Sequence, residues 1–324
     1  MSLFRRLAWR LLWMVCACLI APRVAPAQVV RTADASVRGL RDSDFPRLVP
    51  LAPNVWAYED LNGEVRSNLG FTTNSLIINT SEGVVVVDGQ GSVAKTQRLV
   101  DTIRRLTPQP IRYVVVGADH ADHVAGNSAF PAAATVIAHP NSKATMEAMA
   151  ARARQSGGAP IPVPQETVTD KRVLTLGGTE IQILFLGRAH TGGDLEVYLP
   201  REGILFMSEV FFNRLYPSVG GNRSGRPIEW LATIRRAEAL RATVYVPNHG
   251  FVDSPEVLNE ELVQFRRALE NLVAESRRMH DAGIPLDTAF RTINLGEFGY
   301  WYRAANNMPD AVRQTYLELD GKLP

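Results

Sequence analysis

Short apolar runs separated by polar turn residues dominate most of the chain, and each run predicts a β-strand. Asn62-Gly63, after the first run, is typical of a hairpin turn. The fully apolar run at 113–116 suits a strand that is buried on both faces. The predicted strands cover residues 55–58, 74–78, 83–87, 113–116, 135–138, 173–176, 181–186, 195–199, 204–207 and 243–246.

Helical periodicity predicts the elements between and after these strands. Apolar side chains of residues 92–106 recur on one face, and Pro108 follows the end of the pattern. Strands that come first in meanders and then alternate with helices favour a layered α/β domain, not a Rossmann fold. Further helices are predicted at 141–152, 228–241 and 256–281, and capping helices within 283–324. We expect residues 51–324 to form one domain, preceded by an irregular arm at 28–50.

Residues 1–27 have the features of a secretory signal peptide. Three arginines begin the segment, an apolar run covers 11–21, and Ala-Pro-Ala at 25–27 fits a cleavage site. The run is shorter than the about 20 residues that a membrane-spanning helix needs, although an N-terminal anchor is the alternative. We therefore expect a secreted or periplasmic protein without stable membrane insertion after cleavage, exported by the Sec or the twin-arginine route.

The charge and cysteine content of the mature chain depend on that segment. The whole chain has 35 basic and 33 acidic residues and a formal net charge of +2. Without the arginines of 1–27, 31 basic residues remain against 33 acidic ones, so the net charge becomes −2. No nucleic-acid partner is therefore indicated. Cys16 and Cys18 leave with the segment, which excludes disulfides, thiolate nucleophiles and cysteine metal ligands.

Histidine and carboxylate side chains follow four of the predicted strands. Ligands of open α/β folds collect at the carboxyl ends of strands, and imidazole with carboxylate suits zinc or another divalent ion. Asp122 lies between His120 and His123. A regular strand could not direct three side chains so close in sequence to one point, so we expect either a tight loop that does so or a surface turn. The residues concerned are His120, His123, His190, Glu209 and His249, whereas His139 and His280 are expected to be structural or solvated.

Five segments resemble the motifs of the metallo-β-lactamase superfamily, in the same order. His120-Ala121-Asp122-His123 is similar to the end of HxHxDH, and the run that ends in Asp88-Gly89 is similar to an early strand of the family. Residues 187–194, 205–209 and 246–250 are similar to the GHTxGD, LFxGD and PGHG segments. The resemblance covers about residues 51–250 and implies an αββα sandwich, with a metal site at one edge of two packed sheets.

Two positions depart from these motifs. Ala118 stands where HxHxDH has its first histidine, and Glu209 stands where LFxGD has its aspartate. The resemblance implies that the family's first metal site here keeps only His120 and His190, so Asp119 and Glu209 are considered as further ligands. Two protein ligands are fewer than catalytic zinc sites usually have.

The resemblance implies that the second metal site is complete, with Asp122, His123 and His249 as ligands. We therefore expect zinc, in one or two ions, or another divalent metal. One ion would be held tightly at this Asp-His-His site. A weaker ion would join at the first site, completed by Glu209 and water.

The resemblance further implies a metal-dependent hydrolase that acts on an amide, ester or β-lactam-like small-molecule substrate. Asp122 would bind metal and orient the attacking water, and His120 and His190 would act as general base or hold a substrate oxygen. Asp88 would support a loop or a ligand imidazole, or cap a turn. Because of Ala118, a non-catalytic binding protein on a degenerate scaffold is the alternative. The oligomeric state has no signature in the sequence.

Three loops are expected to border the site and to set its specificity. They cover residues 59–71, 154–165 and 213–227, and Arg223 of the third loop is a candidate partner for a substrate carboxylate.

Overall fold

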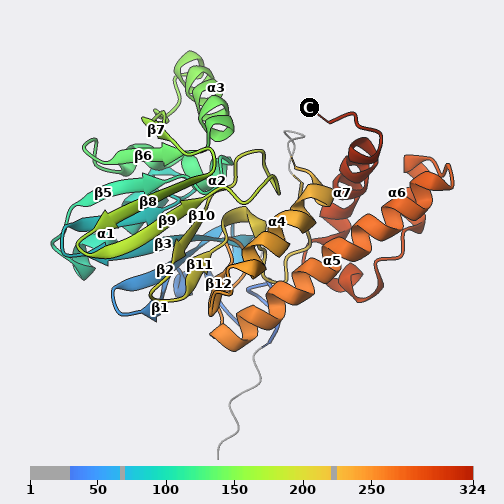
Figure 1. Ribbon diagram of the computed structural model, residues 1–324, viewed down its shortest axis with the longest axis horizontal. Helices are drawn as coiled ribbons and strands as arrows, with labels where there is room; N and C mark the ends of the chain where they lie inside the picture. Colours follow the sequence, from blue (N-terminus) through green and yellow to red (C-terminus); the bar gives the residue numbers. More distant parts are fainter. Residues whose placement is uncertain (1–29, 66–69, 220–224, 324) are drawn as a thin grey trace, which may run out of the picture. The chain divides into compact units, whose positions relative to one another are not determined.

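The computed structural model describes residues 30–65, 70–219 and 225–323, so the signal peptide expected at 1–27 lies outside the described residues. All elements below belong to one unit, Arg31–Pro324. Figure 1 shows two sheets stacked on each other, with helices on the outer side of each.

The first sheet is built in chain order from the first seven strands. Its first four strands pair antiparallel, and the strands from β4 onward pair parallel. The strands are β1 (Arg47–Ala52), β2 (Val55–Asn62), β3 (Phe71–Thr80), β4 (Gly83–Val87), β5 (Ile111–Val115), β6 (Thr135–Ala138) and β7 (Glu166–Thr167).

The second sheet has the order β12-β11-β10-β9-β8. Its neighbours pair antiparallel except β11 and β12, which pair parallel. The strands are β8 (Lys171–Leu176), β9 (Thr179–Leu184), β10 (Glu196–Leu199), β11 (Ile204–Phe206) and β12 (Val244–Val246).

The alternation of side chains along β4 explains why the sheets are covered on both sides. Val85 and Val87 belong to the core cluster that includes Ile181 and Ile183 of β9, so they face the second sheet. Val84 and Val86, which point the other way, pack in a separate cluster with Leu99 and Ile103 of α1 (Val93–Leu106) and Met146 of α3 (Pro140–Ser156). Every residue of β4 is therefore apolar or glycine.

Two helices cover the other face of the second sheet. Ile234 of α4 (Pro227–Ala239) and Leu258 and Phe265 of α5 (Pro255–Asp281) are fully buried in the large core cluster. The layers are therefore helix, sheet, sheet, helix, which confirms the αββα sandwich. After α5 come α6 (Leu286–Thr292) and α7 (Ala304–Leu319), and α7 packs against α4 and α5.

Two local expectations were wrong. The arm expected to be irregular over 28–50 ends in β1, which pairs with β2. β1 is an edge strand with a register shift between Pro50 and Ala52, a position at which proline is tolerated. The β2–β3 pair forms as expected, yet pairing ends at Asn62 and Phe71, so its connection is longer than a two-residue turn at Asn62-Gly63.

None of the helices within residues 30–65, 70–219 and 225–323 is both long and apolar enough to cross a membrane.

Candidate metal centre

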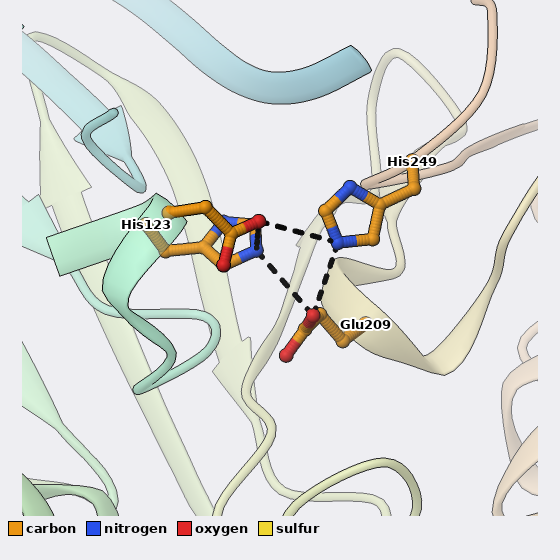
Figure 2. A group of neighbouring side chains, drawn as sticks. His123, Glu209 and His249 are labelled. Carbon is orange, nitrogen blue, oxygen red and sulfur yellow. Dashed lines mark hydrogen bonds and ion pairs between the residues drawn. The ribbon is translucent and has the colours of Figure 1, made fainter. Parts of the chain in front are cut away.

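Side chains from both sheets converge at one edge of the sandwich. Figure 2 shows His123, Glu209 and His249 pointing toward one another from three separate elements. Two overlapping groups of side chains lie close enough to share a metal ion, since the ligand atoms within each group are within 4.8 Å of one another. One group is Asp122, His123, Glu209 and His249, and the other is His120, His190 and Glu209.

A single helical turn presents the residues that follow β5. His120 is the residue before α2 (Ala121–Val124), and its carbonyl accepts hydrogen bonds from the backbone N–H groups of His123 (3.0 Å) and Val124 (3.1 Å). Asp122 and His123 both lie on this turn. The tight loop that the spacing required is therefore a short helix, which can aim neighbouring side chains at one point.

The remaining three residues come from the second sheet's side of the site. His190 lies in the loop after β9, Glu209 in the 3-10 helix Ser208–Val210 after β11, and His249 in the loop after β12. The His190 loop is closed by Asp194, which accepts hydrogen bonds from the backbone N–H (2.8 Å) and hydroxyl (2.7 Å) of Thr191. All of these side chains therefore follow strand ends, as the sequence indicated.

Glu209 is the residue that the two groups share. Its Oε1 lies 3.0 Å from His249 Nε2, 3.3 Å from His190 Nε2 and 3.4 Å from His123 Nε2, and its Oε2 lies 3.0 Å from His120 Nδ1. The carboxylate of this residue thus reaches both halves of the site despite its extra methylene. It supplies the third member of the group that Ala118 leaves short.

Backbone and side-chain acceptors stand behind the imidazoles. His249 Nδ1 lies 2.8 Å from the carbonyl oxygen of Thr72, and His190 Nδ1 is hydrogen-bonded to the carbonyl oxygen of Ser218. Asp88 Oδ2 lies 3.6 Å from His123 Nδ1. Such partners fix the ring orientation and leave the other nitrogen directed into the site.

The charges in the site are strongly coupled. Burial opposes ionisation of Glu209, but the facing imidazoles of His190, His120 and His123 hold the pKa of its carboxyl well below the ordinary value. Burial likewise opposes the charged form of His120, yet the charge of Glu209 outweighs it and raises the pKa of His120 to about 9. At His190 burial dominates and lowers the pKa to about 4. A cation bound here would displace protons from the charged imidazoles, because metals bind the neutral form.

Ala118 and Asp119 do not add ligands. Both side chains are buried, and Asp119 belongs to neither group of possible ligands among the residues described by the structure. Burial raises the pKa of Asp119, and the charge of nearby His120 opposes this shift. Asp119 therefore does not take the place of the missing histidine in the group of possible ligands.

The other two histidines lie outside both groups. His139 precedes α3, accepts a hydrogen bond from the backbone N–H of Asn141 (3.2 Å) and stacks on Phe185. His280, on α5, pairs with Asp281 (3.2 Å) and Asp320 (2.9 Å).

The two groups open into a cavity of ≈ 250 Å³. Its polar floor is formed by the site residues, among them His120, Asp122 and Glu209. Part of its wall comes from two of the three loops expected at the site, through Phe71 and through Leu215 and Ser218, whereas no residue of 154–165 lines it. Arg223, which the sequence offered as a candidate for binding a substrate carboxylate, lies outside the residues that the structure describes.

The sequence profile of the metallo-beta-lactamase superfamily matches residues 69–249. The chain belongs to this superfamily. Among similar proteins, a metallo-beta-lactamase type 2 from Bacillus sp. is 26% identical over 64% of this chain and 77% of its own length. A linear primary-alkylsulfatase from Pseudomonas sp. is 23% identical over 74% of this chain, and the chain spans only 54% of that relative.

A solved structure with the same fold is a double mutant of a sec-alkyl sulfatase. It superposes with a TM-score of 0.66 and 16% sequence identity, covering 85% of this chain and 50% of the sulfatase chain. The family resemblance and the fold class expected from the sequence are thus confirmed. As a member of a superfamily of metallo-hydrolases, the chain carries two candidate metal-binding groups at the expected edge.

Several residues that shape the site carry no motif and were not found from the sequence. Thr72 and Ser218 act through backbone carbonyls, which any residue type can supply. Asn248 donates to Asp88 Oδ2 at 2.8 Å, and its place beside His249 was the only hint. Arg303 lines the cavity from beyond the last motif.

Proposed function

We propose that this chain is an exported metal-dependent hydrolase that cleaves an amide, ester or β-lactam-like bond in a small-molecule substrate. The observation that carries the proposal is the position of Glu209, whose carboxylate lies 3.0 Å from both His249 Nε2 and His120 Nδ1. Export rests on the signal-peptide pattern of residues 1–27. Zinc is the metal we expect, because imidazole and carboxylate without thiolate suit it.

The buried polar atoms of the site fit a metal. Both ring nitrogens of His123 are buried and have no hydrogen-bond partner among the described residues, and His123 Nε2 lies 3.4 Å from the buried carboxylate of Glu209. Buried polar atoms normally find a partner, so a group of such atoms that face one another favours a bound cation. Asp122, His123, Glu209 and His249 would hold one ion tightly, and His120, His190 and Glu209 would hold a second ion more weakly.

The chain's own residues suit hydrolysis at this point. When bound, a divalent cation supplies a water with a pKa lowered to about 7 and a Lewis acid for the substrate. Asp122 faces the cavity, and a hydrogen bond from Thr73 Oγ1 (3.2 Å) to its Oδ2 orients the carboxylate that we assign to positioning water. His120, whose side chain is 21% exposed, is the most accessible imidazole of the site and can hold a substrate oxygen.

The main argument for a non-catalytic binding protein weakens if Glu209 is a metal ligand. Ala118 motivated that alternative, because it removes one ligand of the first site. The group of His120, His190 and Glu209 still offers three ligand atoms, the number that catalytic zinc sites keep. His249→Ala separates the two functions: a hydrolase loses turnover with the metal, whereas a binding protein has no turnover to lose.

Hydrolysis of alkyl sulfate esters is a second candidate. The similarity to the Pseudomonas linear primary-alkylsulfatase extends over 74% of this chain, compared with 64% for the Bacillus lactamase. The reaction would use the same two groups, because an activated water and a polarised leaving group also serve a sulfate ester.

Metal analysis together with three substrates tests these proposals. Zinc content of the purified protein would be measured by elemental analysis beside hydrolysis of nitrocefin, 4-nitrophenyl esters and hexyl sulfate. We expect at least one tightly held zinc per chain, turnover of one substrate class, and loss of the tight zinc in His249→Ala. Zinc without turnover of any of the three would contradict these substrate classes. Protein that stays metal-free after zinc is added would contradict the enzyme itself.

A further inference from the structure

An arginine just before the C-terminal helix α7 lines the cavity beside the metal groups. Arg303 immediately precedes α7 and lies beyond residues 69–249, the part that matches the superfamily profile. It shares the cavity with His120 and Glu209 on the floor and with the apolar side chains Phe71, Phe212 and Leu215. This cation therefore comes from the C-terminal part of the chain, outside the segment that matches the superfamily profile.

The neighbours of Arg303 hold it against the two loops that border the cavity. Tyr302 forms a β-bridge with Leu215, its carbonyl accepts a hydrogen bond from the N–H of Tyr216 (3.0 Å), and its hydroxyl donates to the carbonyl of Gly70 (2.8 Å). Asn307, one turn later, donates to the carbonyl of Tyr216 (2.8 Å). These bonds fix where the side chain of Arg303 begins.

The backbone of Arg303 adopts a conformation that non-glycine residues usually avoid. Its φ is 61°, in the left-handed region. Such a conformation persists only where the surrounding structure holds it, and it is found at ligand-binding sites more often than elsewhere. Here it lets the chain turn from the Tyr302 bridge into α7.

The guanidinium of Arg303 has no carboxylate partner within residues 30–65, 70–219 and 225–323. Its Nε is buried and makes no hydrogen bond to any of these residues, and its Cζ lies 5.3 Å from the ring centre of Phe71. Other part-buried arginines are paired, such as Arg38 with Asp253 at 2.7 Å and Arg214 with Glu261 at 2.9 Å. A buried guanidinium N–H without an acceptor is unfavourable, so the cavity offers a place for one.

We propose that Arg303 binds an oxyanion of the substrate, a carboxylate or a sulfate, and so selects small anionic substrates with an apolar body. The inference rests on the proposed hydrolase function and names its substrate class. A guanidinium binds either oxyanion through two parallel hydrogen bonds, which gives geometric selectivity as well as affinity. The apolar part of the substrate would pack against Phe71, Phe212 and Leu215. Arg303 is thus a specificity residue, and the cleaved bond lies at the metal groups.

Binding of non-hydrolysable probes tests the proposal without requiring turnover. Calorimetric titration of the zinc-loaded protein would compare hexanoate and hexanesulfonate with the neutral analogue hexanamide. For Arg303→Met, we expect the dissociation constants of one or both anions to rise about tenfold or more and that of hexanamide to stay unchanged. Arg303→Lys should recover part of the affinity, since it keeps the charge but loses the planar fork.

The two anions also distinguish the sources of the oxyanion. A larger effect on hexanoate identifies a carboxylate, and a larger effect on hexanesulfonate identifies a sulfate. Equal dissociation constants in wild type and Arg303→Met for both anions would overturn the proposal and leave Arg303 as a packing partner of Phe71. Arg313→Met is the matched control, because Arg313 lies on α7 and, like Arg303, over an aromatic ring, in this case Phe290, but does not line the cavity.

Kinetics with a matched ester pair extend the test to turnover. Mono(4-nitrophenyl) glutarate and 4-nitrophenyl pentanoate share a leaving group and chain length, and only the first carries a carboxylate. Arg303→Met should raise KM for the glutarate about tenfold and leave the pentanoate within about twofold. If neither ester is hydrolysed but anion binding still depends on Arg303, the proposed function would be overturned and the role of Arg303 would stand. If the wild type and Arg303→Met hydrolyse each ester with the same KM and rate, the role of Arg303 would be overturned and the proposed function would stand.

Discussion

At the scale of single residues, the buried carboxylate of Asp88 links three segments of the chain that surround the site. Its Oδ1 accepts hydrogen bonds from the backbone N–H groups of Gly117 (2.7 Å) and Ala118 (3.3 Å), and its Oδ2 accepts one from Asn248 Nδ2 (2.8 Å). The same oxygen lies 3.6 Å from His123 Nδ1. One buried carboxylate thus ties the strand β4 to the chain before α2 and to the loop that carries His249. Burial raises its pKa to about 6.

Asp88→Asn should therefore weaken metal binding without removing a ligand. The amide keeps the shape of the side chain but turns one acceptor oxygen into a donor, which must face an existing N–H group. We expect zinc affinity to fall roughly 10- to 100-fold, the usual effect of losing such a supporting contact. Competition with a chelator would measure it. Asp60→Asn, a buried carboxylate paired with Arg98, is the control, and equal zinc affinity of the two variants would refute the role of Asp88.

At the scale of elements, α4 depends on α7 for its cap. The residue before α4, Arg226, makes no capping hydrogen bond with its side chain. The carboxylate of Glu318 on α7 instead accepts hydrogen bonds from the backbone N–H groups of Ile228 (2.9 Å) and Glu229 (3.0 Å). The backbone N–H of Arg226 also bonds to the carbonyl of Ala189 (2.9 Å), next to His190. The C-terminal helices therefore support the loop of one candidate ligand.

Removing that cap should destabilise the fold measurably. Glu318→Ala leaves two N–H groups at the start of α4 without their acceptor, and loss of a helix cap costs about 1 kcal/mol, within a range of about 0.5–2. Urea unfolding would give the change in the free energy of unfolding. Glu275→Ala removes a partly exposed carboxylate that pairs with Arg278 on α5 and should cost about 0.5 kcal/mol or less. Equal losses in the two variants would contradict the capping role.

Strand β2 contains a buried carboxyl that makes stability depend on pH. Burial raises the pKa of Glu59 from its ordinary 4.5 to about 7, although Arg47 lies 3.1 Å away and the N–H of Val252 donates to it. Between these values the folded chain keeps a proton that the unfolded chain has lost. The folded state binds more protons there, so stability falls as the pH rises.

Glu59→Gln should remove this pH dependence, because the amide does not titrate. Between pH 4.5 and 7 the free energy of unfolding of the wild type should fall by up to about 3 kcal/mol more than that of the variant. Urea unfolding of both proteins across this range would measure the difference. Parallel pH profiles would show that Glu59 ionises in the folded state as it does in water.

Sequence patterns predicted best the elements that have a clear hydrophobic periodicity and residues such as proline at their ends. Helix α1 was expected at 92–106 and runs Val93–Leu106, because its apolar face and Pro108 mark it clearly. Strand β1 was missed, since an edge strand needs no apolar alternation and tolerates Pro50. The candidate ligands could be selected from the sequence because motif order and strand ends coincide. Arg303 was not found, because a side chain brought in by tertiary packing leaves no local pattern.

The shared role of Glu209 was only half visible from the sequence. Its motif position suggested a ligand, and its length left open whether the carboxylate serves one ion or two. The structure brings His120 and His249 to opposite oxygens of this carboxylate, which depends on how far apart the two sheets hold their loops. That separation is a property of the packed core, and residue spacing does not encode it.

At the scale of the whole molecule, the metal groups join the two sheets. His120, Asp122 and His123 follow β5 of the first sheet, whereas His190, Glu209 and His249 follow strands of the second. The sheets meet at this edge through a cluster of mostly buried imidazoles and carboxylates whose ligand atoms face one another. Metal binding should therefore stabilise the contact between the sheets as well as activate water, and the same ion would serve both stability and catalysis.

Removing the metal should consequently lower the stability of the entire domain. A ligand that binds only the folded state stabilises it by about 2.7 kcal/mol at a concentration 100 times its dissociation constant. We expect zinc at such an excess to raise the free energy of unfolding by about this amount, and a chelator to reverse the effect, in a single transition because both sheets hold ligands. Denaturant unfolding of the purified protein with zinc and with chelator measures it. His249→Ala is the control, since it removes a ligand of the four-residue group and should respond much less. A chelator that leaves the unfolding curve of the zinc-loaded wild type unchanged would mean that no ion joins the two sheets, whatever the activity of the protein.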